Sequence, residues 1–121
     1  MSIQFQIEEM LDYLAARFTG AGTAEEAWRQ FEFIAKRCKR ANTNKLLLDF
    51  TDAHVELSLA DRYFIVTSSR IFAQYKLIKT AFVARPQQVD SKRFGEMVAR
   101  NRWINARVFT NVEDAEEWLS E

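Results

Sequence analysis

Apolar and polar residues alternate near the start of the chain. In the stretch from Ile3 to Glu8 every second residue is apolar, which is the period of a strand with one buried face. The same alternation returns in YLAARFTG, at Leu14, Ala16 and Phe18. The short EEMLD connection between the two stretches suits an antiparallel hairpin. The pattern therefore predicts two paired strands.

The apolar period then lengthens to about 3.6 residues, which predicts a helix. Thr23 and Glu26 form a T-x-x-E capping box at its start, because each side chain can accept a hydrogen bond from the backbone N–H of the other residue. The helix is expected to end near KRCKR (36–40), where positive charges favour the negative end of the helix dipole. Its predicted apolar face consists of Ala24, Trp28, Phe31, Ala35 and Cys38.

Three short apolar runs follow, namely KLLLDF (45–50), TAFVARP (80–86) and ARVFTN (106–111). Each predicts a strand, and the continuous run in KLLLDF is typical of a strand that is covered on both faces. Two more helices are predicted, one from about 91 to 102 and a final one after Asn111. Their apolar stripes are Phe94, Met97 and Val98 in the first, and Ala115, Trp118 and Leu119 in the second.

Residues 59–76 combine two patterns. Their β-branched and aromatic residues are typical of a strand, whereas Ser58 and Asp61 supply a capping box and Ala60, Phe64, Thr67, Ile71 and Tyr75 recur at helical period. We favour the helix. It leaves Ile65 and Phe72 on a second apolar stripe. This stripe is either covered within the chain or forms a surface for a protein partner or a second copy in a homodimer.

The predicted order of elements is β-β-α-β-α-β-α-β-α. Strands that alternate with helices imply crossover connections and a mostly parallel sheet. We therefore predict an α/β class with a mixed sheet of about five strands, an N-terminal antiparallel hairpin and four helices. The chain of 121 residues has the size of one domain, so residues 1–121 are taken as a single domain.

Charge and composition exclude several functions. The 17 Lys and Arg residues balance the 17 Asp and Glu residues, so the broad positive field of a nucleic-acid binder is absent. One cysteine, Cys38, and one histidine allow no internal disulfide and no structural zinc site. No apolar run approaches the roughly 18 residues of a membrane span. We expect a cytoplasmic protein without a metal, a cofactor or an integral membrane segment.

The stretch from residue 46 to residue 63 holds most of the candidate chemistry. Ser58 follows a predicted parallel strand and opens a helix, where it is either a helix cap or a site for a phosphate, which the helix dipole would favour. His54 could serve Ser58 as a base, with Asp49 or Asp52 as the orienting group. Because no G-x-S-x-G motif is present, we interpret His54 as a residue of a polar loop and the acids as solvated or capping.

Several segments together resemble one known family. These segments are KLLLDF, ELSLADR (56–62), TAFVARP, VDSKRFGEMVARNR (89–102) and ARVFTNVEDAEEWL (106–119). Between roughly residues 45 and 119 they are similar to the SpoIIAA-like family, bacterial relatives of STAS domains. At the turn around Ser58 this chain reads Leu57-Ser58-Leu59-Ala60, where anti-sigma factor antagonists of that type carry an Asp-Ser-Ser or Asp-Ser-Thr sequence followed by Gly.

The resemblance implies a small cytoplasmic domain that is not an enzyme, with a mixed sheet and flanking helices. In the antagonists a serine at the start of the helix after the central strand is phosphorylated by a partner kinase, and Ser58 occupies the corresponding position. The expected function is regulatory, with an unidentified protein partner bound around the start of the helix at Ser58. The alternative that the resemblance implies is a carrier or sensor of an apolar, lipid-like small molecule in a pocket between helices and sheet.

Overall fold

The described strands of the protein form one mixed sheet. The computed structural model describes residues 3–54, 69–87 and 105–121. The sheet order is β1-β2-β3-β4-β5, in which β1 is antiparallel to β2 and the later neighbours are parallel. This arrangement confirms the predicted mixed sheet with an N-terminal hairpin. The strands are β1 (Gln4–Glu9), β2 (Leu14–Ala21), β3 (Lys45–His54), β4 (Lys79–Val83) and β5 (Ala106–Phe109).

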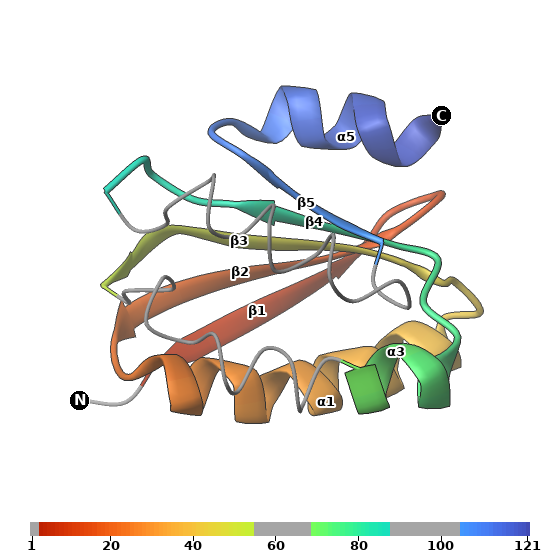
Figure 1. The fold of residues 1–121 in the computed structure, drawn as a ribbon, viewed down its shortest axis with the longest axis horizontal. Coiled ribbons are helices and arrows are strands. Elements are labelled where there is room, and N and C mark those ends of the chain that lie inside the picture. The colour runs from red at the N-terminus through yellow and green to blue at the C-terminus, as the bar shows by residue number, and fades with distance from the viewer. Residues whose placement is uncertain (1–2, 55–68, 88–104) are drawn as a thin grey trace.

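Helices lie on both sides of this sheet (Figure 1). α1 (Ala24–Arg40) and α3 (Ser69–Tyr75) lie side by side on one side, and α5 (Val112–Ser120) lies on the other. The described part of the chain thus contains three helices. The helix predicted at 91–102 falls outside the described residues, so the predicted total of four helices is not reached within them.

The larger core lies between the sheet and α1. Phe18 of β2, Phe50 of β3 and Phe82 of β4 are fully buried on neighbouring strands. The ring centroids are 4.3 Å apart for Phe18 and Phe50 and 6.4 Å apart for Phe50 and Phe82. α1 covers these rings with Ala27, Phe31, Ile34, Ala35 and Cys38. Buried aromatic rings in contact contribute packing energy beyond the area they remove from water, so this ladder of rings is the centre of the fold.

The start of α1 follows the sequence prediction. The Glu26 backbone N–H donates to Thr23 Oγ1 at 3.1 Å, and the Thr23 backbone N–H donates to Glu26 Oε1 at 3.2 Å. Both halves of the capping box are therefore formed. The predicted apolar face is confirmed at Phe31, Ala35 and Cys38, all of which are buried.

β3 is longer than the sequence pattern predicted. The strand was expected to end at Phe50, with His54 in a polar loop, but it continues to His54. This prediction was wrong because residues 52–54 still pair with β2 after an irregularity in the register. Only Ala53 of these three residues is buried. Residues 51–54 of this central strand were therefore missed, because most of them are polar.

Residues 59–76 were predicted to form a helix, and the structure confirms this for the residues that it describes. Residues 69–75 form α3, with Ile71 buried and Tyr75 half-buried on its inner side. α3 packs against α1, and Arg70 Nη1 of α3 donates to Glu32 Oε2 of α1 at 2.9 Å. Residues 55–68 lie outside the described part, and the strand interpretation is excluded only for 69–75.

Candidate functional site

The face of the sheet that carries α5 is only partly covered. Register pairs place side chains in rows across the strands, because directly opposite residues point to the same face. α5 lies over β3, β4 and β5, and none of the described helices covers β1, β2 or the side of β3 next to β2 on this face. We call this region the open face. Its rows are Glu8–Ala15–Leu47, Gln6–Arg17–Asp49 and Gln4–Thr19–Asp52.

The open face is polar because of the strand sequences. The alternate residues of β1 and β2 that point away from α1 include Gln6, Glu8 and Arg17, all exposed. α5 has nine residues, and its buried side chains Ala115, Trp118 and Leu119 pack on Leu47, Ala81 and Val83. These contacts cover the apolar part of this face, which lies on β3 and β4. The polar side chains of β1 and β2 therefore stay accessible to solvent and to a binding partner.

Asp49 is the buried acid of the open face. The residue is 7 % exposed, and its Oδ1 accepts hydrogen bonds from the Thr51 backbone N–H at 2.9 Å and from Thr51 Oγ1 at 2.6 Å. Its Oδ2 lies 3.8 Å from Arg17 Nε. The expectation that the acids of this stretch are solvated or capping is wrong for Asp49, because a buried carboxylate needs such partners to offset its desolvation.

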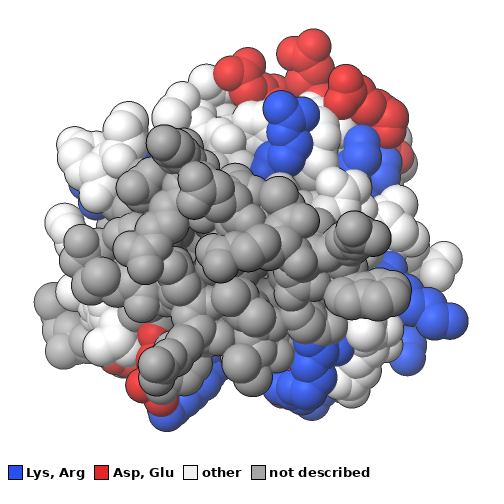
Figure 2. Space-filling view, in the orientation of Figure 1, with Lys and Arg blue, Asp and Glu red and all other residues white. Residues whose placement is uncertain are grey.

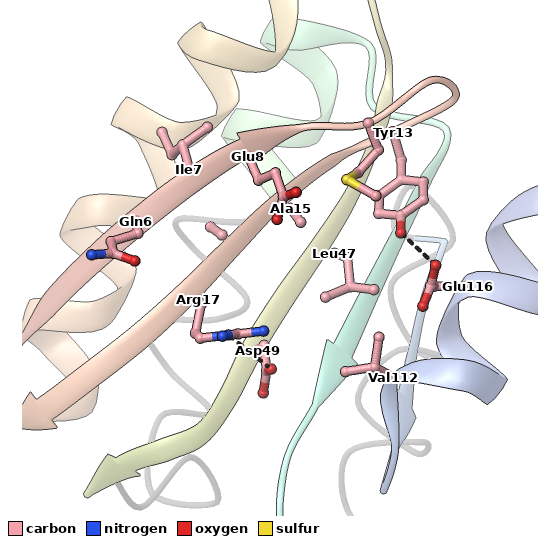
Figure 3. A pocket seen from close by; sticks show the side chains of 12 residues that line it. Gln6, Ile7, Glu8, Tyr13, Ala15, Arg17, Leu47, Asp49, Val112 and Glu116 are labelled. Atoms are coloured by element: carbon pink, nitrogen blue, oxygen red, sulfur yellow. Dashed lines mark hydrogen bonds and ion pairs between the residues drawn. The ribbon is translucent and has the colours of Figure 1, made fainter.

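Arg17 presents a cation beside this carboxylate. Its side chain is 64 % exposed and belongs to the same row as Gln6 and Asp49. The guanidinium has five N–H donors, and the ion pair with Asp49 orients it (Figure 3). Donors of this kind recognise carboxylates, phosphates and backbone carbonyl groups. The middle row of the open face can therefore hold an anionic or carbonyl-bearing group.

Tyr13 and Glu116 close one end of the open face. The Tyr13 hydroxyl donates to Glu116 Oε2 at 2.8 Å, which links the end of the β1–β2 hairpin to α5 (Figure 3). Partial burial, the hydrogen bond to the Glu116 carboxylate and the negative charges of Glu116 and Glu8 raise the pKa of Tyr13 to about 12. The hydroxyl therefore stays protonated at neutral pH and acts as a structural donor.

A groove runs between this link and the Arg17–Asp49 pair. Its volume is about 470 Å³, which is within the range of pockets that hold small organic molecules. Apolar atoms of Met10, Ala15 and Leu47 contribute to its walls beside the charged groups of Arg17 and Glu116. The lining is thus amphipathic, because it combines apolar side chains with hydrogen-bond donors and acceptors.

The last residues of β3 form the other border of the open face. The Gly22 backbone N–H donates to the His54 carbonyl at 3.4 Å, and Arg85 Nη2 donates to the Ala53 carbonyl at 3.1 Å. Asp52 and His54 are both exposed here. These bonds hold the strand end against the turn before α1 and against the end of β4. The segment that contains Ser58 begins directly after this strand end.

The structure describes some of the predicted site residues and not others. Ser58 and Ile65 lie outside the described residues, and Phe72 lies on α3 without a described side chain. His54 is exposed at the end of β3, and Asp49 is bound to Thr51 and Arg17. No group of three metal-ligating residues gathers in the described ranges.

Cys38 behaves as a buried structural residue. Its Sγ donates to the Thr43 carbonyl at 3.2 Å, and burial raises the pKa of the thiol to about 12. A thiol with a raised pKa carries little of the reactive thiolate at neutral pH. This agrees with its predicted position on the inner face of α1.

Three residues of the groove were missed by the sequence interpretation, namely Tyr13, Arg17 and Glu116. A signal was present for Arg17, because it is the charged residue in the outward-pointing set of an otherwise apolar strand. No local signal could pair it with Asp49, which is 32 residues later in the chain. Glu116 was one acid among several in the last helix.

Comparisons with known proteins identify the fold. No protein-family model matches the chain, and no curated protein matches its sequence. An anti-sigma factor antagonist from Mycobacterium paratuberculosis matches with a TM-score of 0.64 and 14 % identity, over 99 % of this chain and 96 % of that one. The anti-sigma factor antagonist SpoIIAA in its unphosphorylated form matches with a TM-score of 0.56 and 11 % identity, over 94 % of both chains.

A third solved structure comes from Shewanella loihica. It is an uncharacterized protein of the DUF3478 family with a SpoIIAA-like fold, and it matches with a TM-score of 0.53 and 20 % identity. The match covers 97 % of this chain and 93 % of that chain. Together the three structures show that the fold of this chain is SpoIIAA-like, the fold of STAS domains, and they confirm the resemblance that the sequence motifs indicated. None of the described helices has both the length and the apolar character needed to cross a membrane.

Proposed function

We propose that this chain is a STAS-type regulatory domain that binds a protein partner where β3 ends, with Ser58 as the residue whose charge controls binding. The observation that carries the proposal is the SpoIIAA-like fold, shared over nearly the whole chain with two anti-sigma factor antagonists. In such domains function resides in the site and not in the fold alone. In this proposal the open face and the end of β3 form that site.

The surroundings of the strand end support control by charge. Ser58 is four residues after His54 in the sequence, and four residues of chain reach at most about 14 Å. Asp52 is exposed on the same strand end, and Asp49 follows in the next row. A phosphate adds close to two negative charges and repels nearby carboxylates. Phosphorylation of Ser58 would therefore change what this edge of the sheet can bind.

The proposal assigns the domain a binding function and no catalytic one. A hydrolase built on Ser58 and His54 would need an acid to orient the histidine. Of the two acids considered for this role, Asp49 is engaged by Thr51 and Arg17, and Asp52 is exposed to solvent. A cytoplasmic location belongs to the same proposal, because it provides the reducing conditions and the regulatory partners that the function requires.

A capture experiment tests the proposal. Tagged wild-type protein, Ser58→Ala and Ser58→Glu are used to capture proteins from a lysate of the native organism, and recovered proteins are quantified by mass spectrometry. We expect at least one protein to be recovered equally by wild type and Ser58→Ala, and at least ten-fold less by Ser58→Glu, because the glutamate adds a negative charge six residues after the exposed Asp52.

Ser120→Glu is the matched control, since Ser120 is exposed near the end of α5, on a different element. This variant should capture the same protein as wild type. Equal recovery by all four proteins would contradict control by charge at Ser58. A loss that is the same in Ser58→Glu and Ser120→Glu would also contradict it, because the effect would then not depend on position.

A second candidate function is the carriage of an amphipathic small molecule. It is favoured by the groove of about 470 Å³ between α5 and the sheet, with its mixed lining of apolar side chains, Arg17 and Glu116. A ligand with an anionic head and a short apolar tail would match that lining, because the head would face the guanidinium and the tail would contact Leu47 and Met10.

Native mass spectrometry and thermal unfolding with added fatty acid test this candidate. We expect a mass increase and a higher unfolding temperature for wild type and for Ala15→Ser, which keeps the groove volume. Ala15→Phe, which fills the groove, should lose both effects. Binding that is unchanged in Ala15→Phe, or no binding to wild type, would rule the groove out as a carrier site.

A further inference from the structure

β1 is an edge strand with one side unpaired. It is the first strand in the sheet order, and within the described part of the chain it pairs with β2 alone. It has six residues and contains neither a proline nor an irregularity in its pairing. The free N–H and C=O groups of such an edge can pair with another strand unless charges, bulges or prolines prevent it. β1 carries acids only at Glu8 and Glu9.

α1 follows this edge along its whole length. Gln30 Nε2 donates to the Ile3 carbonyl at 3.1 Å, the rings of Phe33 and Phe5 are 5.7 Å apart, and Arg37 Nη2 lies 3.8 Å from Glu9 Oε1. Three residues spaced by three and four positions lie on one face of a helix. This face of α1 and the edge of β1 therefore form one continuous strip.

Two side chains of the strip lack contacts in the single chain that residues of their kind usually make. Phe33 is 55 % exposed, although it is a large apolar residue in the middle of the strip. Gln30 Oε1 is buried without a hydrogen-bond partner in the described structure, and buried acceptors of this kind are uncommon. The hollow beside Gln30 is lined by Ile3, which precedes β1, and by residues of β1 and β2 that include Phe5. Phe33 is exposed where a neighbouring molecule would contact the edge, and Gln30 lies next to it on the same face of α1.

We propose that a second copy of this chain pairs with β1 in antiparallel fashion, with Gln6 on the two-fold axis. In this register Phe5 faces the partner's Ile7, and Gln4 faces the partner's Glu8. Apolar residues meet on the side of α1, and an amide meets a carboxylate on the open face, twice by symmetry. Like charges do not face each other in any of these pairs.

Other antiparallel registers fit less well. Shifting the axis by half a residue would place apolar side chains opposite polar ones, because side chains alternate between faces. An axis at Phe5 would pair only residues 4–6 of the strand, and an axis at Ile7 would set Phe5 against the partner's Glu9. The axis at Gln6 pairs five of the six residues of β1. It also brings Phe33 of both copies close to the axis, where each can be covered.

This inference goes beyond the proposed function, since it needs no other protein and does not involve Ser58. The dimer would join the two sheets edge to edge and bring the two open faces side by side. It also differs from the stripe at Ile65 and Phe72, for which the sequence left a dimer surface as one of two alternatives. The two surfaces can be separated by mutation.

A cysteine cross-link tests the register. In antiparallel strands directly opposite Cα atoms are about 4.5 to 5.5 Å apart, which is within the range for a disulfide. Gln6→Cys should therefore form a covalent dimer under mild oxidation, as seen on a non-reducing gel. Gln4→Cys is the matched control, because position 4 faces position 8 of the partner and should remain monomeric. The native Cys38 is buried and should not react.

Light scattering tests the surface. We expect a dimer for wild type, at least a ten-fold weaker dimer for Phe33→Glu, and an unchanged dimer for Ile78→Glu. Ile78 is exposed to a similar extent, 48 %, directly before β4. Circular dichroism establishes that each variant is folded. A wild-type monomer at 100 µM concentration, or a dimer that forms no cross-link at position 6, would overturn the proposal. A dimer lost in Ile65→Asp with Phe72→Asp but kept in Phe33→Glu would also overturn it.

Discussion

At the scale of single residues, the Tyr13–Glu116 hydrogen bond connects the β1–β2 hairpin to α5. The pKa of Tyr13 is raised to about 12 in the folded chain, compared with about 10 for an unfolded tyrosine. The folded state thus holds this proton more tightly. Its contribution to stability is fully present below pH 10 and is lost as the pH rises toward 12.

Tyr13→Phe tests this contribution. The variant should unfold about 1.5 kcal/mol more easily at pH 8, the lower end of the range for one hydrogen bond to a charged group. Between pH 10 and 12 its stability should fall less steeply than that of wild type, because Tyr13 no longer titrates. Urea unfolding at several pH values measures both effects. Parallel curves for the two proteins above pH 10 would show that the Tyr13 hydroxyl has an ordinary pKa.

The sequence could predict residues whose roles depend on near neighbours. Thr23 with Glu26, and Asn111 at the start of α5, are caps formed within three positions, and the structure contains both. Arg17 and Asp49 could not be paired in advance, because their contact depends on the parallel register of β2 and β3.

At the scale of elements, lysines of the sheet hold the end of α5. Lys45 Nζ donates to the Leu119 carbonyl at 2.7 Å, and Lys79 Nζ donates to the Trp118 carbonyl at 2.8 Å. Lys79 Nζ also lies 5.1 Å from the centre of the Trp118 ring. Cations at a helix C-terminus interact favourably with the helix dipole and with the free carbonyl groups. Figure 2 shows acidic side chains gathered over α5, and the lysines are beneath that helix.

Lys79→Met should therefore loosen α5. We expect a loss of about 1 to 2 kcal/mol in the free energy of unfolding and faster hydrogen exchange in residues 112–120 than elsewhere. Lys36→Met is the control, since Lys36 is exposed on α1, and it should change neither quantity. Equal effects of both substitutions would show that Lys79 contributes only through the general charge of the protein.

Element boundaries were less predictable than the elements themselves. Hydrophobic periodicity predicted all five described strands, α1, α5 and the described part of the helix before β4. The error at the end of β3 arose because Thr51, Asp52 and His54 are polar, although the strand pairing continues through them. Pairing with a neighbouring strand can extend a strand past its apolar run, and that neighbour is not visible locally.

At the scale of the whole molecule, the topology explains the open face. Three of the described strands, β3 to β5, lie under α5, and β1 and β2 extend the sheet beyond it (Figure 1). The alternation of strands and helices predicted the mixed sheet and its hairpin. It did not predict which strands α5 would cover, because that depends on the packing of Trp118 and Leu119 onto Leu47, Ala81 and Val83.

The central claim is that the partner binds where β3 ends. Amide chemical shifts of the labelled protein, recorded by NMR during titration with the captured partner, test it most directly. We predict that the largest changes occur at Gly22, Asp52, His54, Ser58 and Arg85, and that Ser58→Glu abolishes them. Changes confined to α5, or to the α1 residues that flank β1, would contradict the account.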